Sequence, residues 1–112
     1  MQTMRPFQPK TNGTVAIANS LTVTSAQPLD DTCSEFAFLN TSATATAFIA
    51  VTNTDGGESP VAPTVSTAGS IGTPIPPGAG LIRLSFGMGK KSIRVIASAA
   101  DGTLYVMPGK GN

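Results

Sequence analysis

Few side chains in this 112-residue chain could perform catalysis or hold a metal ion. Histidine, the commonest general base and metal ligand, is absent. The single cysteine, Cys33, therefore has no histidine to activate it, and one thiol cannot build a zinc site by itself. We predict that Cys33 is a small buried thiol.

The six carboxylates fall mainly in stretches that are typical of turns. Asp30, Asp31 and Glu35 make one group, and Asp55 and Glu58 flank two glycines in another. Calcium loops and glycosidase carboxylate pairs are the chemistries that such groups suggest. Neither group has the ligand spacing of a calcium hand, and acidic residues beside glycine commonly form turns. We therefore predict no metal site, no cofactor, no catalytic residue and no enzymatic activity.

The glycine-rich segment GMGK at residues 87–90 superficially resembles a phosphate-binding loop. A Walker loop, however, requires GxxxxGK followed by serine or threonine at the start of a helix. This segment instead joins two apolar runs, so we predict a hairpin turn that holds both Lys90 and Lys91. These lysines are the only local basic cluster, and the net charge is +1, which does not favour nucleic-acid binding.

Two arginines stand among apolar neighbours in the C-terminal third. Arg83 and Arg94 lie in successive apolar runs, which we expect to form adjacent antiparallel strands with both side chains directed outward. Two interpretations remain open. The arginines are solvated surface side chains, or they form a contact stripe for acidic residues of a partner.

Three apolar runs bounded by glycine, proline or Asp-Gly are the clearest strands in the chain. They span residues 81–86, 93–97 and 104–107. The turn signals between them predict a three-stranded β-meander. We expect this meander to be the platform against which the other strands pack.

Two-residue periodicity predicts further strands in the first half of the chain. Residues 14–18 and 21–25 alternate well, and residues 34–40 and 44–52 are predicted to form a second hairpin. A helix is the alternative for residues 42–51, because alanine favours it. The alternating threonines there favour a strand.

The middle of the chain is rich in turn-forming residues. Residues 61–66 are predicted to form a short edge strand, because Pro63 lacks the donor that a central strand needs. Residues 67–80, which contain many glycines and prolines, are predicted to be a surface connection. Together these patterns give seven to eight short strands and no convincing helix. They predict an all-β domain at residues 14–112, a small antiparallel β-sandwich or jelly roll.

Residues 1–13 precede this domain as an extended N-terminal arm. Pro6 and Pro9 fix φ and remove hydrogen-bond donors, so the arm cannot run inside a sheet. Met4 and Phe7 are apolar but have no local core to enter. Two interpretations remain open: a disordered terminus, or an arm that docks on a neighbouring subunit with Phe7 as its anchor.

The composition favours packing against another protein. Charged residues make up 12% of the chain, and threonine and serine supply much of the polarity. A weakly charged surface loses little solvation when it is buried. The sequence shows neither the apolar core of a secretory signal nor the ~18 apolar residues of a membrane span. We expect synthesis in a reducing cytoplasm and no membrane partner.

Several strand-and-turn motifs resemble those of small proteins from tailed phages and prophages. The motifs are the arm RPFQP, the segment EFAFLNTSATATAFIAVTN, the connection PPG and the ending GTLYVMPGKG. They cover most of the chain, and Lys110 departs from the pattern, in which an acidic residue is common. On these motifs the chain resembles the small jelly-roll head decoration (cement or staple) proteins of podoviruses of the epsilon-15 type.

The resemblance implies a structural virion protein, made in the host cytoplasm and located on the outer surface of the capsid. It would bridge neighbouring copies of the major capsid protein and stabilise the shell, as a homodimer or a higher homo-oligomer. No catalytic residue comes with the resemblance. The candidate partner-contact residues are Met4, Arg5, Phe7, Arg83 and Arg94.

Two other functions remain open for the same fold. One is a β-domain of a phage tail, fibre or baseplate. The other is a carbohydrate-binding module, which normally presents exposed aromatic rings. The chain has no tryptophan, and Tyr105 is its single tyrosine.

Overall fold

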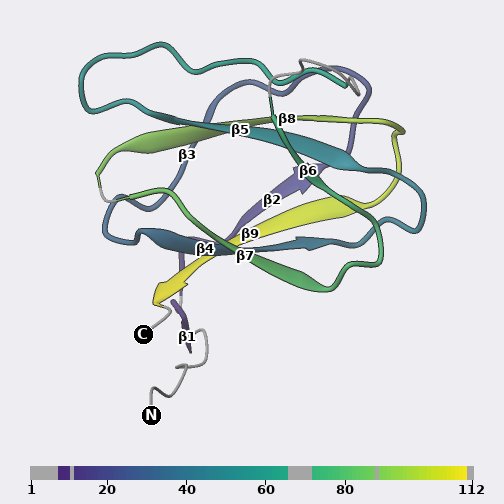
Figure 1. The fold of residues 1–112 in the computed structure, drawn as a ribbon, viewed down its shortest axis with the longest axis horizontal. Helices are drawn as coiled ribbons and strands as arrows, with labels where there is room; N and C mark the ends of the chain where they lie inside the picture. Colours follow the sequence, from purple (N-terminus) through teal and green to yellow (C-terminus); the bar gives the residue numbers. More distant parts are fainter. Residues whose placement is uncertain (1–7, 11, 66–71, 88, 111–112) are drawn as a thin grey trace.

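The computed structural model describes residues 8–10, 12–65, 72–87 and 89–110, which form a sandwich of two antiparallel β-sheets (Figure 1). The described residues contain strands and loops but no helix. The strands are β1 (Gln8–Pro9), β2 (Val15–Ala18), β3 (Gln27–Pro28), β4 (Glu35–Asn40), β5 (Ala47–Asn53), β6 (Thr73–Ile75), β7 (Leu81–Ser85), β8 (Lys91–Ala97) and β9 (Thr103–Lys110). The all-β sandwich predicted from the sequence is confirmed.

The strands follow the order of a jelly roll. Sheet A contains β1, β9, β4 and β7 in that order, with β2 also paired to β9, and sheet B contains β3, β8, β5 and β6. One long antiparallel ribbon explains both sheets, because β2 pairs with β9, β3 with β8, β4 with β7 and β5 with β6. The ribbon is rolled up so that β4 also meets β9 and β5 also meets β8.

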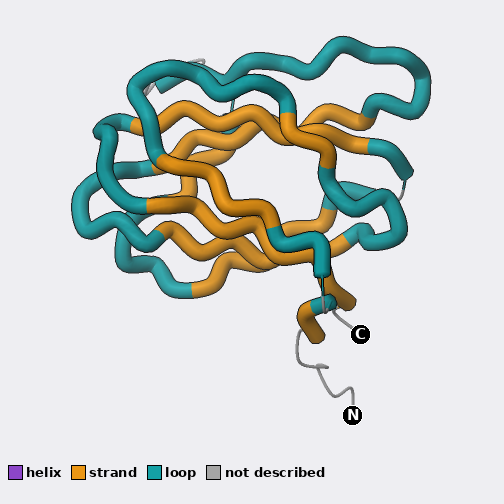
Figure 2. Tube along the Cα trace, turned by 180° about the vertical axis from the view of Figure 1, so that it is seen from behind, coloured by secondary structure: helices purple, strands orange, loops and turns teal. Residues whose placement is uncertain are grey.

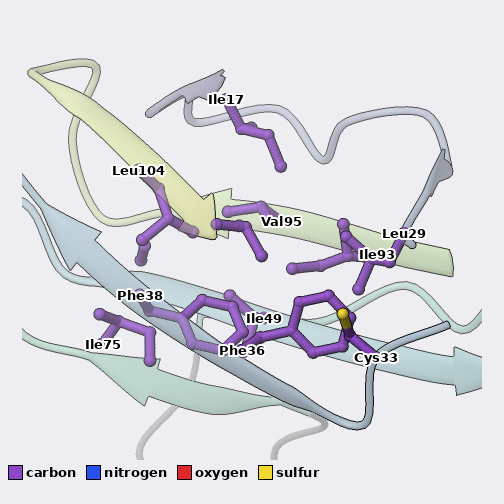
Figure 3. Close-up of a cluster of buried hydrophobic side chains, with 12 residues drawn as sticks. Ile17, Leu29, Cys33, Phe36, Phe38, Ile49, Ile75, Ile93, Val95 and Leu104 are labelled. Carbon is purple, nitrogen blue, oxygen red and sulfur yellow. The ribbon is translucent and has the colours of Figure 1, made fainter. Parts of the chain in front are cut away.

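The core fills the space between the sheets, because alternate residues of each strand point inward (Figure 3). The Phe86 ring lies 6.2 Å from the ring of Phe36 and 5.9 Å from that of Phe38, between centroids. Tilted and edge-to-face rings at such distances attract each other. The core cluster comprises Ile17, Leu29, Cys33, Phe36, Phe38, Ala47, Ile49, Ile75, Ile93, Val95, Leu104 and Val106.

The three C-terminal strands form where the sequence predicts them, but they do not pair with one another. β7 and β9 lie in sheet A on either side of β4, whereas β8 lies in sheet B. The predicted meander is therefore wrong. The chain therefore passes from sheet A to sheet B between β7 and β8, and residues 98–102 carry it back to sheet A, instead of turning within one sheet.

The predicted second hairpin is wrong for the same reason, because β4 belongs to sheet A and β5 to sheet B. Residues 21–25 do not form the predicted strand, although the Thr24 amide donates to the Val95 carbonyl at 2.9 Å. Residues 61–65 do not form a strand either, and residue 66 lies outside the described residues.

The connection that follows β5 runs back along the outer side of sheet B (Figures 1 and 2). Its Val61 amide donates to Thr52 Oγ1 of β5 at 3.0 Å, and its Pro63 is buried. A Cβ added at Gly72 would lie 3.0 Å from Pro63 Cβ, so the connection packs closely against the start of β6. β6 itself lies within residues 67–80, where we predicted a connection without a strand.

Candidate functional site

The described N-terminal residues are attached to the end of sheet A. In β1, Gln8 pairs with Lys110 and Pro9 with Gly109 of β9. The Lys10 amide then donates to the Pro108 carbonyl at 2.8 Å. Pro9 is tolerated because β1 lies at a sheet edge, where a missing donor breaks no ladder. The first described residues are therefore held at a defined point beside β9.

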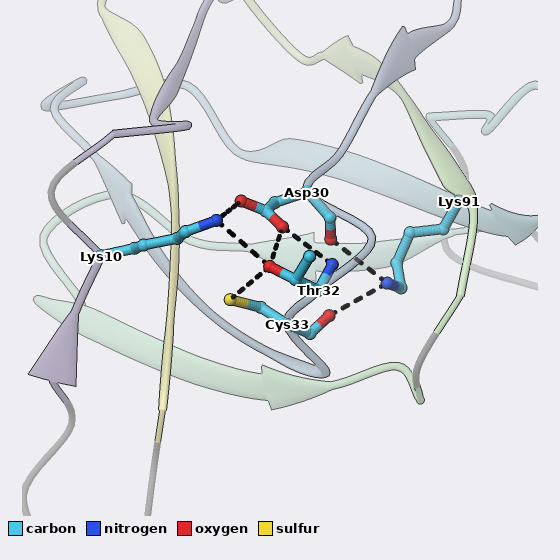
Figure 4. A network of polar contacts seen from close by, with 5 residues as sticks. All are labelled: Lys10, Asp30, Thr32, Cys33 and Lys91. Atoms are coloured by element: carbon cyan, nitrogen blue, oxygen red, sulfur yellow. Dashed lines mark hydrogen bonds and ion pairs between the residues drawn. The ribbon is translucent and has the colours of Figure 1, made fainter.

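A polar network fixes this attachment to the loop between β3 and β4 (Figure 4). Lys10 Nζ forms an ion pair with Asp30 Oδ2 and donates to Thr32 Oγ1 at 3.1 Å. Asp30 Oδ1 accepts the Thr32 amide at 2.8 Å, which closes a local turn. Gly13, at φ 91°, passes close by, because a Cβ there would lie 3.1 Å from Pro108 Cγ.

The ion pair changes the titration of both partners. The hydrogen bond from Lys10, aided by those from Thr32, lowers the pKa of Asp30 to about 2. The same hydrogen bond with Asp30 raises the pKa of Lys10 above its ordinary value. The Lys10 side chain is 38% exposed, so water and salt screen the pair. The pair therefore positions the arm more than it stabilises the fold.

Lys91 organises the same end of the sandwich from within. Its residue is 2% exposed, and its Nζ donates to the carbonyls of Gly89 at 2.8 Å, Cys33 at 3.0 Å and Asp30 at 3.4 Å. The ammonium also lies 5.3 Å from the centroid of the Phe36 ring, within cation–π range. One buried cation thus holds the loops on either side of it.

The prediction that Lys90 and Lys91 share a turn is wrong for Lys91, which begins β8 and points inward with Ile93 and Val95. Lys90 is exposed. The prediction that Cys33 is buried is confirmed. We call the part of the molecule formed by Lys10, Asp30, Thr32, Lys91 and their partners the arm end.

Neutral polar groups close the opposite end of the sandwich. Asn40 is 5% exposed and donates through Nδ2 to the carbonyls of Ala45 at 2.8 Å and Ile75 at 2.9 Å. Its Oδ1 accepts Asn19 Nδ2 and the Ser42 amide, both at 3.1 Å. Since Asn40 belongs to sheet A and Ile75 to sheet B, one amide links the two sheets.

The loops at this end are joined to the same group. Asn19 Nδ2 donates to the Asp101 carbonyl at 2.8 Å, and Ser42 Oγ donates to Asp101 Oδ2 at 2.7 Å. Gly102, at φ 77°, lies directly over Ser42, because an added Cβ would be 2.6 Å from the Ser42 nitrogen. We call the part formed by Asn19, Asn40, Ser42 and the loop at Asp101 the amide end.

The two arginines predicted to form a joint contact stripe lie on opposite outer faces. Arg83 is in β7 of sheet A, with Nη2 at 3.1 Å from Glu35 Oε1. Arg94 is in β8 of sheet B, and its Nε donates to the Thr24 carbonyl at 3.0 Å. The predicted stripe on adjacent strands is therefore wrong. The other three predicted contact residues, Met4, Arg5 and Phe7, lie outside the described residues.

The structure instead presents a row of apolar side chains across the outer face of sheet A, which we call the open face. The register aligns Ala16, Tyr105, Leu39 and Leu81 on β2, β9, β4 and β7. Aligned residues of antiparallel strands share one face. Leu81 is 60% exposed and Tyr105 37%.

Sequence reasoning missed this row, although one signal was available. Leu39 alternates with Phe36 and Phe38, so it had to face away from the core. What the sequence could not supply was the pairing of four strands that are distant along the chain.

The carboxylates are dispersed over the described residues. No group of three or more acidic or cysteine side chains there is arranged to hold a metal ion. Likewise, no helix among these residues is long and apolar enough to cross a membrane.

Comparison of the chain with protein-family models, with curated proteins and with solved structures found no match.

Proposed function

We propose that this chain is a structural virion protein that decorates the outside of a phage head and links neighbouring copies of the major capsid protein. The proposal extends the resemblance of its strand-and-turn motifs to head decoration proteins. It is compatible with the jelly-roll strand order of sheets A and B. A decoration protein needs a rigid body and a means of reaching the next subunit.

The observation that carries the proposal is the fixed root of the N-terminal arm. β1, the Lys10 amide and the Lys10–Asp30 ion pair hold residues 8–10 against the sandwich. The seven residues before Gln8 can span about 23 Å when extended. An arm that leaves a rigid body from a defined point has a restricted set of places to dock, which lowers the entropy lost on binding.

The arm supplies apolar groups for such a contact. Met4 and Phe7 lie outside the described residues, and burial of each contributes about 1.5–3 kcal/mol if complete. Ordering the arm costs conformational entropy that offsets much of this gain, so the arm alone binds weakly. Repetition of the contact over a shell, with the sandwich as a second point of attachment, makes the weak link effective.

The test adds the purified chain to heads of the encoding phage that lack it. We expect saturable binding in many copies per head and an increase in the temperature at which the heads rupture. A variant that begins at Gln8 keeps β1 and the sandwich and should bind about 10-fold more weakly. Absence of binding by the wild-type chain, or labelling of tails instead of heads, would refute the proposal.

The contribution of the fixed root is tested separately from that of the arm. Lys10→Met keeps the arm but removes the ion pair with Asp30, and we expect weaker binding to heads. Lys90→Met is the matched control, because Lys90 is also exposed and only its backbone amide bonds to Asp55. Equal binding by the two variants would show that the root does not matter.

A further inference from the structure

The open face lies on the outside of sheet A. Leu81 and Tyr105 lie in a row toward the amide end, at 60% and 37% exposure, and Ala16 is exposed beside them. Met107 continues the apolar character along β9. A flat row of this kind on a sheet is unfavourable in water unless another surface covers it.

The outer side of sheet B is different, because the chain itself crosses it; the exposed Val61 and Val65 on this side belong to that connection and not to the sheet. The connection after β5 runs along this side, held by the Val61 amide on Thr52 Oγ1 and by buried Pro63 (Figures 1 and 2). Arg94 is engaged by the Thr24 carbonyl. Among the described residues, the outer side of sheet A is therefore the one that no connection of the chain covers.

The charge on the open face selects the kind of partner. Among its described side chains, Glu35 and Arg83 are the charged ones, and their 3.1 Å ion pair lies toward the arm end. The face is therefore electrically neutral. A basic or acidic partner such as nucleic acid would find no opposite charge there, whereas an apolar, weakly charged protein surface would lose little solvation.

The area of the face is smaller than the area that a specific interface buries on each partner. Its strands β2, β9, β4 and β7 have four, eight, six and five residues, which at ~3.3 Å per residue and ~4.8 Å between strands give roughly 360 Å². Specific association needs about 800 Å² on each partner. Gln8 pairs with Lys110 at the border of the same face, so residues 1–7, which can span about 23 Å, are within reach of the contact.

We propose that the open face lies on the shell, against an apolar and weakly charged patch of the major capsid protein, and that residues 1–7 extend the same contact. This inference rests on the proposed function and assigns the surface that performs it. The side of sheet B and its covering connection then face the solvent.

Two double variants with the same change of charge test this assignment. Leu81→Lys with Tyr105→Lys places two cations on the open face. Val61→Lys with Val65→Lys places two cations on the connection over sheet B, at side chains of similar exposure, 42% and 46%. We expect the first to weaken binding to heads about 100-fold and the second to change it less than about 3-fold.

The outcomes separate the inference from the proposed function. Binding by the wild-type chain with equal affinity of both double variants would overturn the assignment of the face and leave decoration intact. No binding by the wild-type chain would overturn both. A third outcome is that the wild-type chain sediments as a dimer and that Leu81→Lys with Tyr105→Lys makes it monomeric without loss of head binding. This outcome would show that the open face binds a second copy of the chain instead of the shell.

A measurement on the unmodified chain guards against variants that fail to fold. Hydroxyl-radical oxidation of Tyr105 and Met107 is compared between the free chain and the chain bound to heads. We expect oxidation of both side chains to fall at least about 3-fold on binding, because the partner excludes solvent from the face. Unchanged oxidation would overturn the assignment.

Discussion

The two ends of the sandwich are both held by polar groups, but the chemistry of the groups differs. At the arm end, the cations Lys10 and Lys91 bind a carboxylate and three backbone carbonyls. At the amide end, neutral Asn19 and Asn40 bind carbonyls and an amide that come from loops and from β6 of sheet B. The first arrangement attaches chain segments to the sandwich, and the second joins its two layers.

Because of this difference, only one end can respond to pH and salt. Ion pairs that are partly exposed weaken with salt and with titration of either partner, whereas buried neutral hydrogen bonds do neither. The arm root can therefore loosen in acid or salt while the layers stay joined.

Asn40→Ala should have the largest effect. It removes four hydrogen bonds and leaves the Ser42 amide and two carbonyls buried without this partner. We expect the free energy of unfolding to fall by about 3–5 kcal/mol in denaturant titrations. Asn53→Ala is the control, because Asn53 is exposed and bonds only locally to the Asp55 amide. Similar losses for both variants would contradict the role of the amide end.

Lys91→Met should cost somewhat less, because methionine fills a similar volume. The carbonyls of Gly89, Cys33 and Asp30 lose their shared donor, and we expect a loss of about 2–4 kcal/mol. The neighbouring Lys90→Met, at an exposed side chain, should change the free energy of unfolding by less than about 0.5 kcal/mol. A neutral result for Lys91→Met would show that the carbonyls find other donors.

Gly102→Ala compared with Gly57→Ala isolates the close approach at the amide end. Both glycines have positive φ, 77° and 83°, so each alanine bears a backbone cost of about 1–2 kcal/mol. An added Cβ at Gly57 meets nothing within 4 Å, whereas at Gly102 it meets the backbone of Ser42. We expect thermal unfolding to show an additional loss of about 2 kcal/mol for Gly102→Ala. Equal losses would rule out a tight turn.

Acid should have the smallest effect, and it should act at the arm end. Because the folded-state pKa of Asp30 is lowered to about 2, its contribution is present above the unfolded value near 3.8 and is lost as the pH falls toward 2. The raised pKa of Lys10 keeps the pair intact up to at least pH 10.5. NMR titration should find the pKa of Asp30 about 2 in the wild type and closer to 3.8 in Lys10→Met.

Free energies of unfolding measured at several pH values can also contradict this prediction. The difference in free energy of unfolding between the wild type and Lys10→Met should be constant from about pH 5 to pH 10, fall as the pH drops toward the folded-state pKa of about 2, and vanish only below it. The same difference for Lys90→Met should not follow this profile. A Lys10→Met difference that is undiminished at pH 2 would exclude the ion pair as its cause.

The class of fold follows from the sequence, because alternation and turn signals are local properties. The runs at 81–86, 93–97 and 104–107 became β7, β8 and β9. The sequence did not predict which strands pair, because a short glycine-rich loop can return the chain to the same sheet or carry it across to the other. That choice depends on burial of both faces, which no local window contains.

The buried polar groups and the apolar row on sheet A were less predictable than the fold. Lys91 shares its parity with Ile93 and Val95, and Asn40 shares it with Phe36 and Phe38, so alternation alone directs both inward. Polar residues enter a core only where partners exist, and these partners come from loops far along the chain. The row of Ala16, Tyr105, Leu39 and Leu81 likewise exists only once four distant strands align.

The position of β9 has a consequence for how the chain acquires its structure. β9 pairs with β1, β2 and β4, yet it is synthesised after all the other strands. The ladder from Val15 to Val106 closes a loop of most of the chain, which makes folding slow. All four strands of sheet B have been synthesised once β8 is complete, so we expect sheet B to form before sheet A during synthesis. Protease resistance of β5 and β8 that appears only with residues 103–110 would contradict this order.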